Sequence, residues 1–200
     1  MCTLIQETAM MDPVMSSRTV REFTDQPVSD DMLQDLLKTA MSASSAGDQR
    51  PWHFVVIRDL KTREWMEEAL PEAFMVTQAP LSILLCGDLS YQKHVGFWAL
   101  DCAAATENIV IGADHLGLGA IWLGIYPIEG RVQQFRTVLN LPKKITPFSL
   151  VVVGYPAERR RNEERYIPSR IHYDGWLGAK AKAETGGSGK SNDPDRRADE

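Results

Sequence analysis

The chain has 200 residues, and 44% of them are hydrophobic. It can therefore build one α/β domain with a substantial hydrophobic core, and it is too short for two such domains. Its formal net charge of −5 argues against a general nucleic-acid or membrane-surface binder, which would need a basic face. Its three cysteines include no CxxC pair and indicate neither a disulfide framework nor a zinc site.

The beginning of the chain, MCTLIQETAMMDPVM, lacks the basic residues and the sustained apolar core of a signal peptide. No apolar run approaches the length of a membrane span. We therefore expect a soluble protein that is located in the cytoplasm.

The first predicted helix begins after Ser29, a good N-cap residue, and its apolar side chains from Met32 to Met41 follow helical spacing. The residues His53 to Ile57 are rich in β-branched and aromatic side chains, which predicts a strand. A second helix is expected from Thr62 to Leu70, because Pro71 would end it.

The apolar run from Leu81 to Cys86 predicts a strand buried on both faces. The next helix, Phe97 to Leu116, is apolar on most sides and must be buried on most sides. In so short a chain, a subunit interface can cover part of that surface. Gly117 and Gly119 suit the C-terminal end of this helix.

The remaining predicted elements are a short strand at Ala120–Gly124, a helix at Glu129–Leu139 and a buried strand at Phe148–Val153. Helices and strands therefore alternate around one compact mixed sheet. We predict a single domain over residues 1–177, with a C-terminal arm at about 157–177. Residues 178–200 have almost nothing to bury and are predicted to form a disordered tail.

A glycine-rich nucleotide motif is not indicated by Gly117-Leu118-Gly119. A dinucleotide fingerprint needs a third glycine where Trp122 stands, and it should open a helix rather than end one. The four histidines show no metal-ligand spacing, and no nucleophile elbow is present. The sequence therefore offers neither a metal site nor a catalytic nucleophile.

Three polar segments could bind an anionic or planar ligand. Arg18 and Arg21 flank the hydroxyl of Thr19, and arginine forks fit phosphate oxygens. The small residues from Ala43 to Gly47, followed by Pro51-Trp52, would let the backbone approach a planar group. Arg165 and Arg170 lie in a late charged stretch. Taken singly, each segment fits an ordinary solvated loop better.

Together, these segments resemble the motifs of the nitroreductase family in order and separation. Residues 17–23 resemble its N-terminal Arg-Arg-Ser-x-Arg-x-Phe motif, and residues 43–54 its Ala-Pro-Ser-x-x-Asn-x-Gln-Pro-Trp-x-Phe segment. Residues 101–124 are similar to its long central helix and Trp-x-Gly strand, and residues 153–158 to its last core strand. Residues 166–176 resemble its C-terminal arm. The likeness covers about residues 14–176.

The resemblance implies a nitroreductase-like α+β fold, in which helices flank a central mixed or antiparallel sheet. It implies a homodimer formed through the long central helix, with two FMN molecules at the subunit interface. The implied cofactor-binding residues are Arg18, Thr19, Arg21, Ser44, Ser45, Asp48, Leu123, Gly124, Ile125, Arg165 and Arg170. Arg18, Thr19 and Arg21 would hold the flavin phosphate or the pyrimidine edge, and Arg165 or Arg170 would complete the phosphate site. Ser45 would lie against the flavin, and the backbone of residues 123–125 would pass near the ring.

Three positions depart from the family pattern. Ser17 replaces the first arginine of the motif, so phosphate binding must depend more on Arg18, Arg21 and the late arginines. Asp48 and Arg50 replace the usual asparagine and glutamine, which alters hydrogen bonding near the flavin or the substrate. Trp98, Tyr126 and Phe97 are candidates for an apolar wall over the ring or for ordinary core.

The implied activity is an FMN-dependent oxidoreductase in which the flavin carries the chemistry and no side chain is a catalytic acid or base. NAD(P)H would reduce the FMN, which would then reduce an electron-poor small molecule such as a nitroaromatic or a quinone, in a ping-pong sequence. Reductive dehalogenation is a related alternative. Two alternatives are not enzymes. One is a flavin-binding or flavin-storage protein without turnover, and the other is a structural domain that has lost its cofactor.

Overall fold

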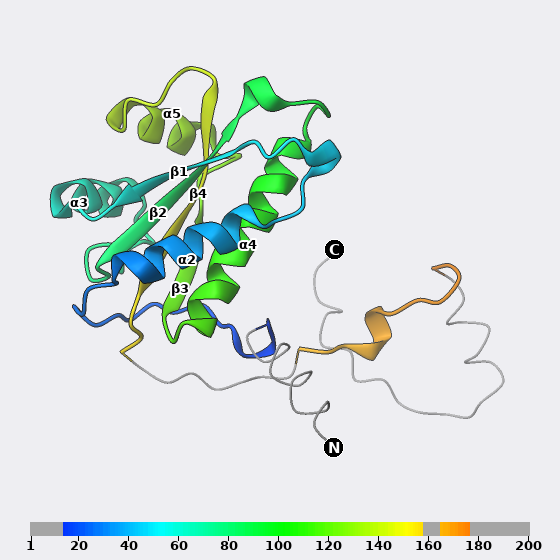
Figure 1. Ribbon diagram of the computed structural model, residues 1–200, viewed down its shortest axis with the longest axis horizontal. Helices are drawn as coiled ribbons and strands as arrows, with labels where there is room; N and C mark the ends of the chain where they lie inside the picture. The colour runs from blue at the N-terminus through cyan, green and yellow to red at the C-terminus, as the bar shows by residue number, and fades with distance from the viewer. Residues whose placement is uncertain (1–13, 158–164, 177–200) are drawn as a thin grey trace, which may run out of the picture. The chain divides into compact units, whose positions relative to one another are not determined.

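The computed structural model describes residues 14–157 and 165–176. The first range belongs to one compact unit of the chain and the second to another. The predicted tail at 178–200 lies outside the described residues. Within the first unit, helices lie on both faces of a four-stranded sheet (Figure 1).

The sheet has the strand order β1-β2-β4-β3, and each neighbouring pair is antiparallel. Its strands are β1 (Trp52–Ile57), β2 (Leu81–Asp88), β3 (Gly119–Gly124) and β4 (Ile145–Gly154). Of the two arrangements expected, mixed and antiparallel, the four strands form the antiparallel one. Parallel pairing in the described residues is confined to an isolated bridge between Thr19 and Ala120.

Strand β4 begins three residues before the predicted start at Phe148. Pro147 lies inside it, and a proline within an apolar run normally argues against a strand because it lacks an N–H group. Here Pro147 pairs with Cys86, at the point where the β2–β4 register shifts. A bulge of this kind accommodates the missing donor. Strand β2 likewise continues two residues beyond the predicted end, to Asp88.

The four main helices are close to the predicted ones: α2 (Asp30–Met41), α3 (Leu60–Ala69), α4 (Phe97–His115) and α5 (Glu129–Val138). Ser29 caps α2 as predicted, and its hydroxyl accepts from the Met32 N–H at 3.2 Å. Helix α3 begins two residues earlier than expected, because Asp59 is its N-cap and accepts from the Thr62 N–H at 2.8 Å. Short 3₁₀ turns lie at Ala46–Asp48 (η1), Leu89–Tyr91 (η2) and Pro168–Arg170 (η3).

Two hydrophobic cores lie on opposite faces of the sheet. Helices α2 and α4 cover the face that carries Ile83, Leu85 and Val151. Helices α3 and α5 cover the other face, where Leu84 and Val152 point. The alternation along β2 confirms that this strand is buried on both faces. Each fully buried aliphatic side chain stabilises the fold by about 1.5–3 kcal/mol.

The end of α4 confirms the stop that the glycines predict. The Leu118 N–H donates to the Ala113 carbonyl at 2.8 Å, and the Gly117 N–H donates to the Asp114 carbonyl at 3.0 Å. Gly117 has a φ of +73°, the left-handed conformation that this helix ending requires. In the part of the chain that the structure describes, no helix is long and apolar enough to cross a membrane.

Candidate functional site

The segment that carries Arg18 and Arg21 is docked on the edge strand β3. The Val20 N–H donates to the Ala120 carbonyl at 2.9 Å, and the Thr24 N–H donates to the Tyr155 carbonyl at 2.9 Å. A Cβ at Gly119 would overlap the side chain of Val20, so this close approach requires glycine there. The backbone of the predicted phosphate-binding segment is therefore fixed at the start of β3.

The predicted phosphate-binding side chains differ in their surroundings. The Arg18 guanidinium donates to the carbonyls of Met15 and Ser17, at 2.8 and 2.6 Å, and Thr19 is half-buried. Arg21 is exposed and makes no hydrogen bond or ion pair with the described residues. Its guanidinium can therefore donate to an external anion without breaking an internal contact.

The predicted ring-binding segment, Leu123–Ile125, is the other end of the same strand. The Ile125 N–H donates to the Phe148 carbonyl at 3.1 Å. Because hydrogen-bonding direction alternates along an antiparallel strand, the N–H and carbonyl of Gly124 point away from β4. Gly124 is exposed, and a Cβ there would meet no atom within 4 Å. An outward-facing peptide donor thus borders open space.

An aromatic cluster lies beside this end of β3. The ring centroid of Trp98 is 4.8 Å from that of Tyr126 and 6.0 Å from that of Phe148, both edge-on. Trp98 is buried, whereas Tyr126 is 40% exposed and Phe97 is 49% exposed. Of the three candidates for an apolar wall, Trp98 is core, and Tyr126 and Phe97 present surface to a ligand or a partner.

The loop at residues 45–50 has an unusual backbone. Gly47, Asp48 and Arg50 all have positive φ, of 57°, 54° and 45°, a conformation that costs a non-glycine residue about 1–2 kcal/mol. Asp48 and Arg50 form an exposed two-point ion pair, with N···O distances of 2.6 and 3.0 Å. The Arg50 N–H donates to the Ser45 hydroxyl at 3.1 Å. Two of the three departures from the family pattern, Asp48 and Arg50, therefore pair with each other.

A buried polar pair that the sequence analysis missed holds this loop. Asp101, in α4, accepts from the Ala46 N–H at 2.9 Å and from the Gln49 side-chain amide at 2.5 Å. The Gln49 carbonyl oxygen accepts in turn from the Lys93 N–H at 3.0 Å. Asp101 and Gln49 are each only 4% exposed. The available signal was an acidic residue, Asp101, set among the apolar side chains of the first turns of α4.

The structure separates the predicted residues into two groups along α4. The N-terminal segment lies at the end of the helix, where the Ser16 hydroxyl donates to Asp114 at 2.5 Å. The loop with Ser44, Ser45 and Asp48 lies near its beginning, at Asp101. These two carboxylates are thirteen residues apart, which is about 20 Å along a helix. Within one chain the two groups therefore do not meet.

Arg165 and Arg170 lie in the second described unit, where both are exposed and Arg170 ends η3. The imidazole of His172 stacks on Trp176 in the same unit, with ring centroids 4.2 Å apart. The convergence of these arginines with Arg18 and Arg21 stays a prediction.

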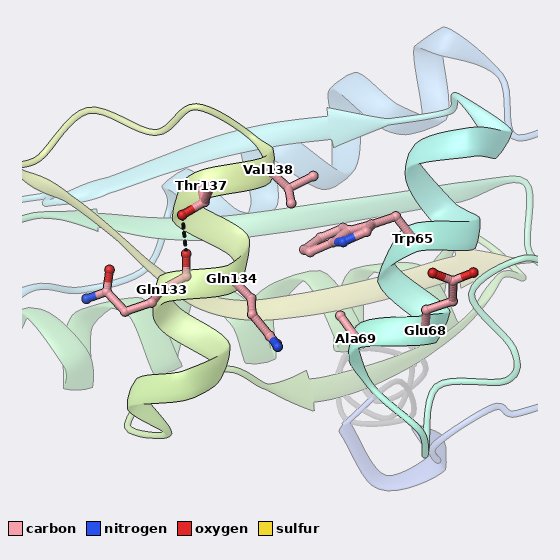
Figure 2. A pocket seen from close by; sticks show the side chains of 7 residues that line it. All are labelled: Trp65, Glu68, Ala69, Gln133, Gln134, Thr137 and Val138. Carbon is pink, nitrogen blue, oxygen red and sulfur yellow. Dashed lines mark hydrogen bonds between the residues drawn. The ribbon is translucent and has the colours of Figure 1, made fainter.

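A separate recess of about 490 Å³ lies between α3 and α5 (Figure 2). The indole of Trp65 points into it from α3, and Gln134 and Val138 face it from α5. The lining of the recess contains one charged residue, Glu68, and no lysine, arginine or predicted site residue. The recess is therefore unsuited to a phosphate. Among the described residues, no group of three His, Cys, Asp or Glu side chains could hold a metal ion.

Comparison with known proteins agrees with the resemblance seen in the motifs. The sequence profile described as "Nitroreductase family" matches residues 14–97 and 76–155. A protein of Methanothermobacter thermautotrophicus, named "Putative NADH dehydrogenase/NAD(P)H nitroreductase", is 39% identical over 167 residues, covering 84% of this chain and 87% of its own length. The "FMN reductase [NAD(P)H]" of Bacillus subtilis is 26% identical over 174 residues, covering 78% of this chain and 69% of its own length.

Solved structures share the fold. A Bacteroides thetaiotaomicron protein with the same name as the M. thermautotrophicus relative superposes with a TM-score of 0.80 at 37% identity, covering 84% of this chain and 98% of its own. An "FMN-dependent Nitroreductase" of Clostridium difficile superposes with a TM-score of 0.77 at 23% identity, over 84% of this chain and 100% of its own.

Proposed function

This chain belongs to the nitroreductase family of oxidoreductases, and we propose that it is an FMN-dependent NAD(P)H oxidoreductase that works as a homodimer. The proposed acceptor is an electron-poor small molecule such as a nitroaromatic or a quinone. NAD(P)H and the acceptor would use one site in turn, which is a ping-pong sequence. A cytoplasmic location stays a prediction of the sequence.

The observation that carries this proposal is the placement of two distant segments along one strand. The Arg18–Arg21 segment pairs with β3 at Ala120, and the outward-facing N–H of Gly124 lies four residues further along. At about 3.3 Å per residue, the two positions are about 13 Å apart. A cationic end and a free backbone donor at this separation fit an elongated ligand with an anionic group at one end and a polar ring at the other.

The residues present fit FMN in their chemistry. When bound, FMN would supply the hydride transfer that the side chains of this chain cannot. Arg18, Thr19 and Arg21 would hold the phosphate or the pyrimidine edge through charge-assisted hydrogen bonds. The outward N–H of Gly124 would donate to the ring, and Tyr126 would shield the ring from water.

A homodimer accounts for the separation of the predicted residues along α4. In the described unit, α4 exposes large apolar side chains, with Leu100 64% exposed and Phe97 49% exposed. If two copies of α4 pack together, Ser44, Ser45 and Asp48 of one subunit can reach the flavin held by Arg18 and Arg21 of its partner. Arg165 or Arg170 would complete the phosphate site.

Flavin retention tests the proposed cofactor site. We expect Arg21→Ala to bind FMN about 10- to 100-fold more weakly than the unmodified protein, because it loses a charge-assisted contact of about 1.5–3 kcal/mol. Lys61→Ala, which removes another exposed cation far from β3, is the control and should bind normally. The measurement is FMN affinity by fluorescence quenching. Equal affinities of the two variants would contradict the site.

Anaerobic titration separates an enzyme from a flavin store. We expect NADH or NADPH to bleach the visible absorbance of the bound flavin, and a nitroaromatic or quinone to restore it. A flavin that stays oxidised under both nicotinamides would favour the storage protein instead. A purified protein that binds no flavin at all would reject both functions.

A further inference from the structure

Arg131 joins two parts of the chain that are distant in sequence. Its Nη1 donates to the Gly124 carbonyl at 2.8 Å, and its Nη2 lies 2.6 Å from the Glu72 carboxylate. The Arg131 side chain is 23% exposed, so the ion pair is partly shielded from solvent. A contact with this geometry restrains both of its partners.

The position of Arg131 in its helix is electrostatically unfavourable. It is the third residue of α5, and the first turn of a helix repels positive charge. The N-cap residue, Ile128, has no side-chain capping hydrogen bond. The stabilisation must therefore come from the contacts that the guanidinium makes outside its own helix.

Among the described residues, Arg131 is the one hydrogen-bond donor to the Gly124 carbonyl, while the Ile125 N–H of the same peptide donates to Phe148. Gly124 ends the edge strand, its carbonyl points away from β4, and the bridge to Thr19 reaches only as far as Ala120. Glycine also leaves the backbone the greatest freedom to rotate. Arg131 therefore supplies the restraint that a neighbouring strand would supply elsewhere in the sheet.

The other partner, Glu72, belongs to a fixed part of the fold. It lies in the connection between α3 and β2, where the Ala73 N–H donates to the Leu70 carbonyl at 2.8 Å. Arg63, which is buried, donates to the Thr77 carbonyl at 3.0 Å and to the Ala79 carbonyl in the same connection. Arg131 is thus anchored to the layer of α3 and α5 at one side and holds the end of β3 at the other.

We propose that Arg131, oriented by Glu72, is a positioning residue that fixes the Gly124 peptide at the ligand-facing edge of β3. The role assigned to that peptide rests on the proposed function. Arg131 touches neither flavin nor substrate in this arrangement and acts through the backbone. The Gly124 carbonyl belongs to the Gly124–Ile125 peptide and the Gly124 N–H to the Leu123–Gly124 peptide, and the two peptides share the Gly124 Cα. By limiting rotation about that Cα, Arg131 keeps the N–H directed at the ring, because small misalignments of such donors slow catalysis strongly.

A first experiment tests the restraint in the protein without flavin. The amides of Ile125 and Tyr126 both donate to the Phe148 carbonyl, at 3.1 and 3.0 Å. We expect Arg131→Ala to speed their hydrogen exchange by roughly tenfold, since local opening becomes easier. Glu72→Gln should give a smaller increase in the same direction, and Arg131→Lys should restore part of the protection.

The control variant is Gln133→Ala, which removes a side chain of the same helix whose amide donates to Glu129. It should leave the hydrogen-exchange rates of the Ile125 and Tyr126 amides unchanged. The Ile121 amide, in the middle of β3, is an internal control whose exchange rate should be the same in every variant. Unchanged exchange at Ile125 and Tyr126 in both Arg131→Ala and Glu72→Gln would overturn the inference. This result does not depend on whether flavin binds.

A second experiment separates positioning from a simple effect of charge. The variants Arg131→Ala and Glu72→Gln remove opposite charges, so a charge effect shifts the reduction potential of bound flavin in opposite directions. A positioning effect shifts it in the same direction, because both variants free the Gly124 peptide. Shifts of opposite sign would overturn the inference. Absence of flavin from the unmodified protein would instead reject the proposed function and leave the exchange result to decide.

Discussion

Two buried polar side chains, Gln49 and Asp101, decide the path of the loop that carries Ser45 and Asp48. An ionised carboxylate is costly to bury unless donors surround it, and here the Ala46 N–H and the Gln49 amide supply them. These contacts offset the strain of two non-glycine residues with positive φ in the same loop. The loop is therefore held by long-range contacts with α4 and does not depend on its own turn chemistry alone.

Single residues also give the protein a defined response to alkaline pH. Burial raises the pKa of the Cys86 thiol from 9.0 to about 12, and burial raises the pKa of Cys102 as well. From about pH 9 upward the unfolded thiols ionise while the folded ones keep their protons, so the free energy of unfolding falls as the pH rises. The contribution of the two protonated thiols to the free energy of unfolding is complete below about pH 9 and is lost as the pH rises above that value.

The double variant Cys86→Ala/Cys102→Ala tests this pH dependence. It is less stable at pH 8 because it leaves cavities, but its stability should change less between pH 8 and pH 10. We expect the unmodified protein to lose roughly 3 kcal/mol more than the variant over that interval, since one pKa unit corresponds to about 1.4 kcal/mol for each of the two thiols. Urea unfolding at both pH values measures it. Parallel losses in the two proteins would show that the thiols do not contribute.

At the scale of elements, helix ends are set by local backbone chemistry. Ser29 and Asp59 each accept an N–H of the first turn, and Gly117 closes α4 with a left-handed residue. These signals act over a few residues, so the sequence predicts them well. Asp59 shows the limit: the predicted helix begins at Thr62, although the spacing of Asp59 from Thr62 suits an N-cap.

Gly117 and Gly130 give a matched pair of glycine substitutions with opposite effects. A Cβ at either position would meet no atom within 4 Å, so only backbone conformation distinguishes them. Gly117→Ala should destabilise the protein by about 1 kcal/mol, because alanine disfavours the left-handed region. Gly130→Ala lies within α5 and should stabilise it by about 0.5–1 kcal/mol. Thermal unfolding compares them, and a shift of the same sign in both would refute this account.

In the molecule as a whole, the sheet separates two hydrophobic cores, and neither core covers the exposed side of α4. Apolar side chains such as Leu100 and Phe97 gain nothing from exposure to water. Burying them against a second copy of α4 is the physical basis of the proposed homodimer. It would also build each flavin site from two chains.

A charge on α4 tests the dimer. We expect Leu100→Glu to give a monomer in size-exclusion chromatography with light scattering and to lower flavin content, because the site needs both subunits. The control is Leu60→Glu, which places the same charge at an exposed leucine of α3 that is 50% exposed. It should leave both the mass and the flavin content unchanged. A dimeric, flavin-loaded Leu100→Glu protein would place the interface elsewhere.

Much of the fold followed from the sequence because its elements have strong periodic patterns. The apolar run of β2 predicted burial on both faces, and the structure puts Leu84 and Leu85 in different cores. The missed beginning of β4 has a tertiary cause, since Pro147 is accommodated only by the bulge opposite Cys86. The antiparallel order of the strands was likewise beyond local patterns, because pairing joins segments that lie far apart in the chain.

Motifs and periodicity are local properties, so they were enough to predict the family, the main helices and strands, and the residue types that suit an anionic cofactor. Which of these residues lie close together depends on how the elements pack. The tertiary structure places the Arg18–Arg21 segment and Gly124 along one strand, pairs Asp48 with Arg50, and brings Arg131 and Glu72 to the Gly124 carbonyl. These contacts join residues from separate elements, and their geometry exists only once the sheet and its helices have packed.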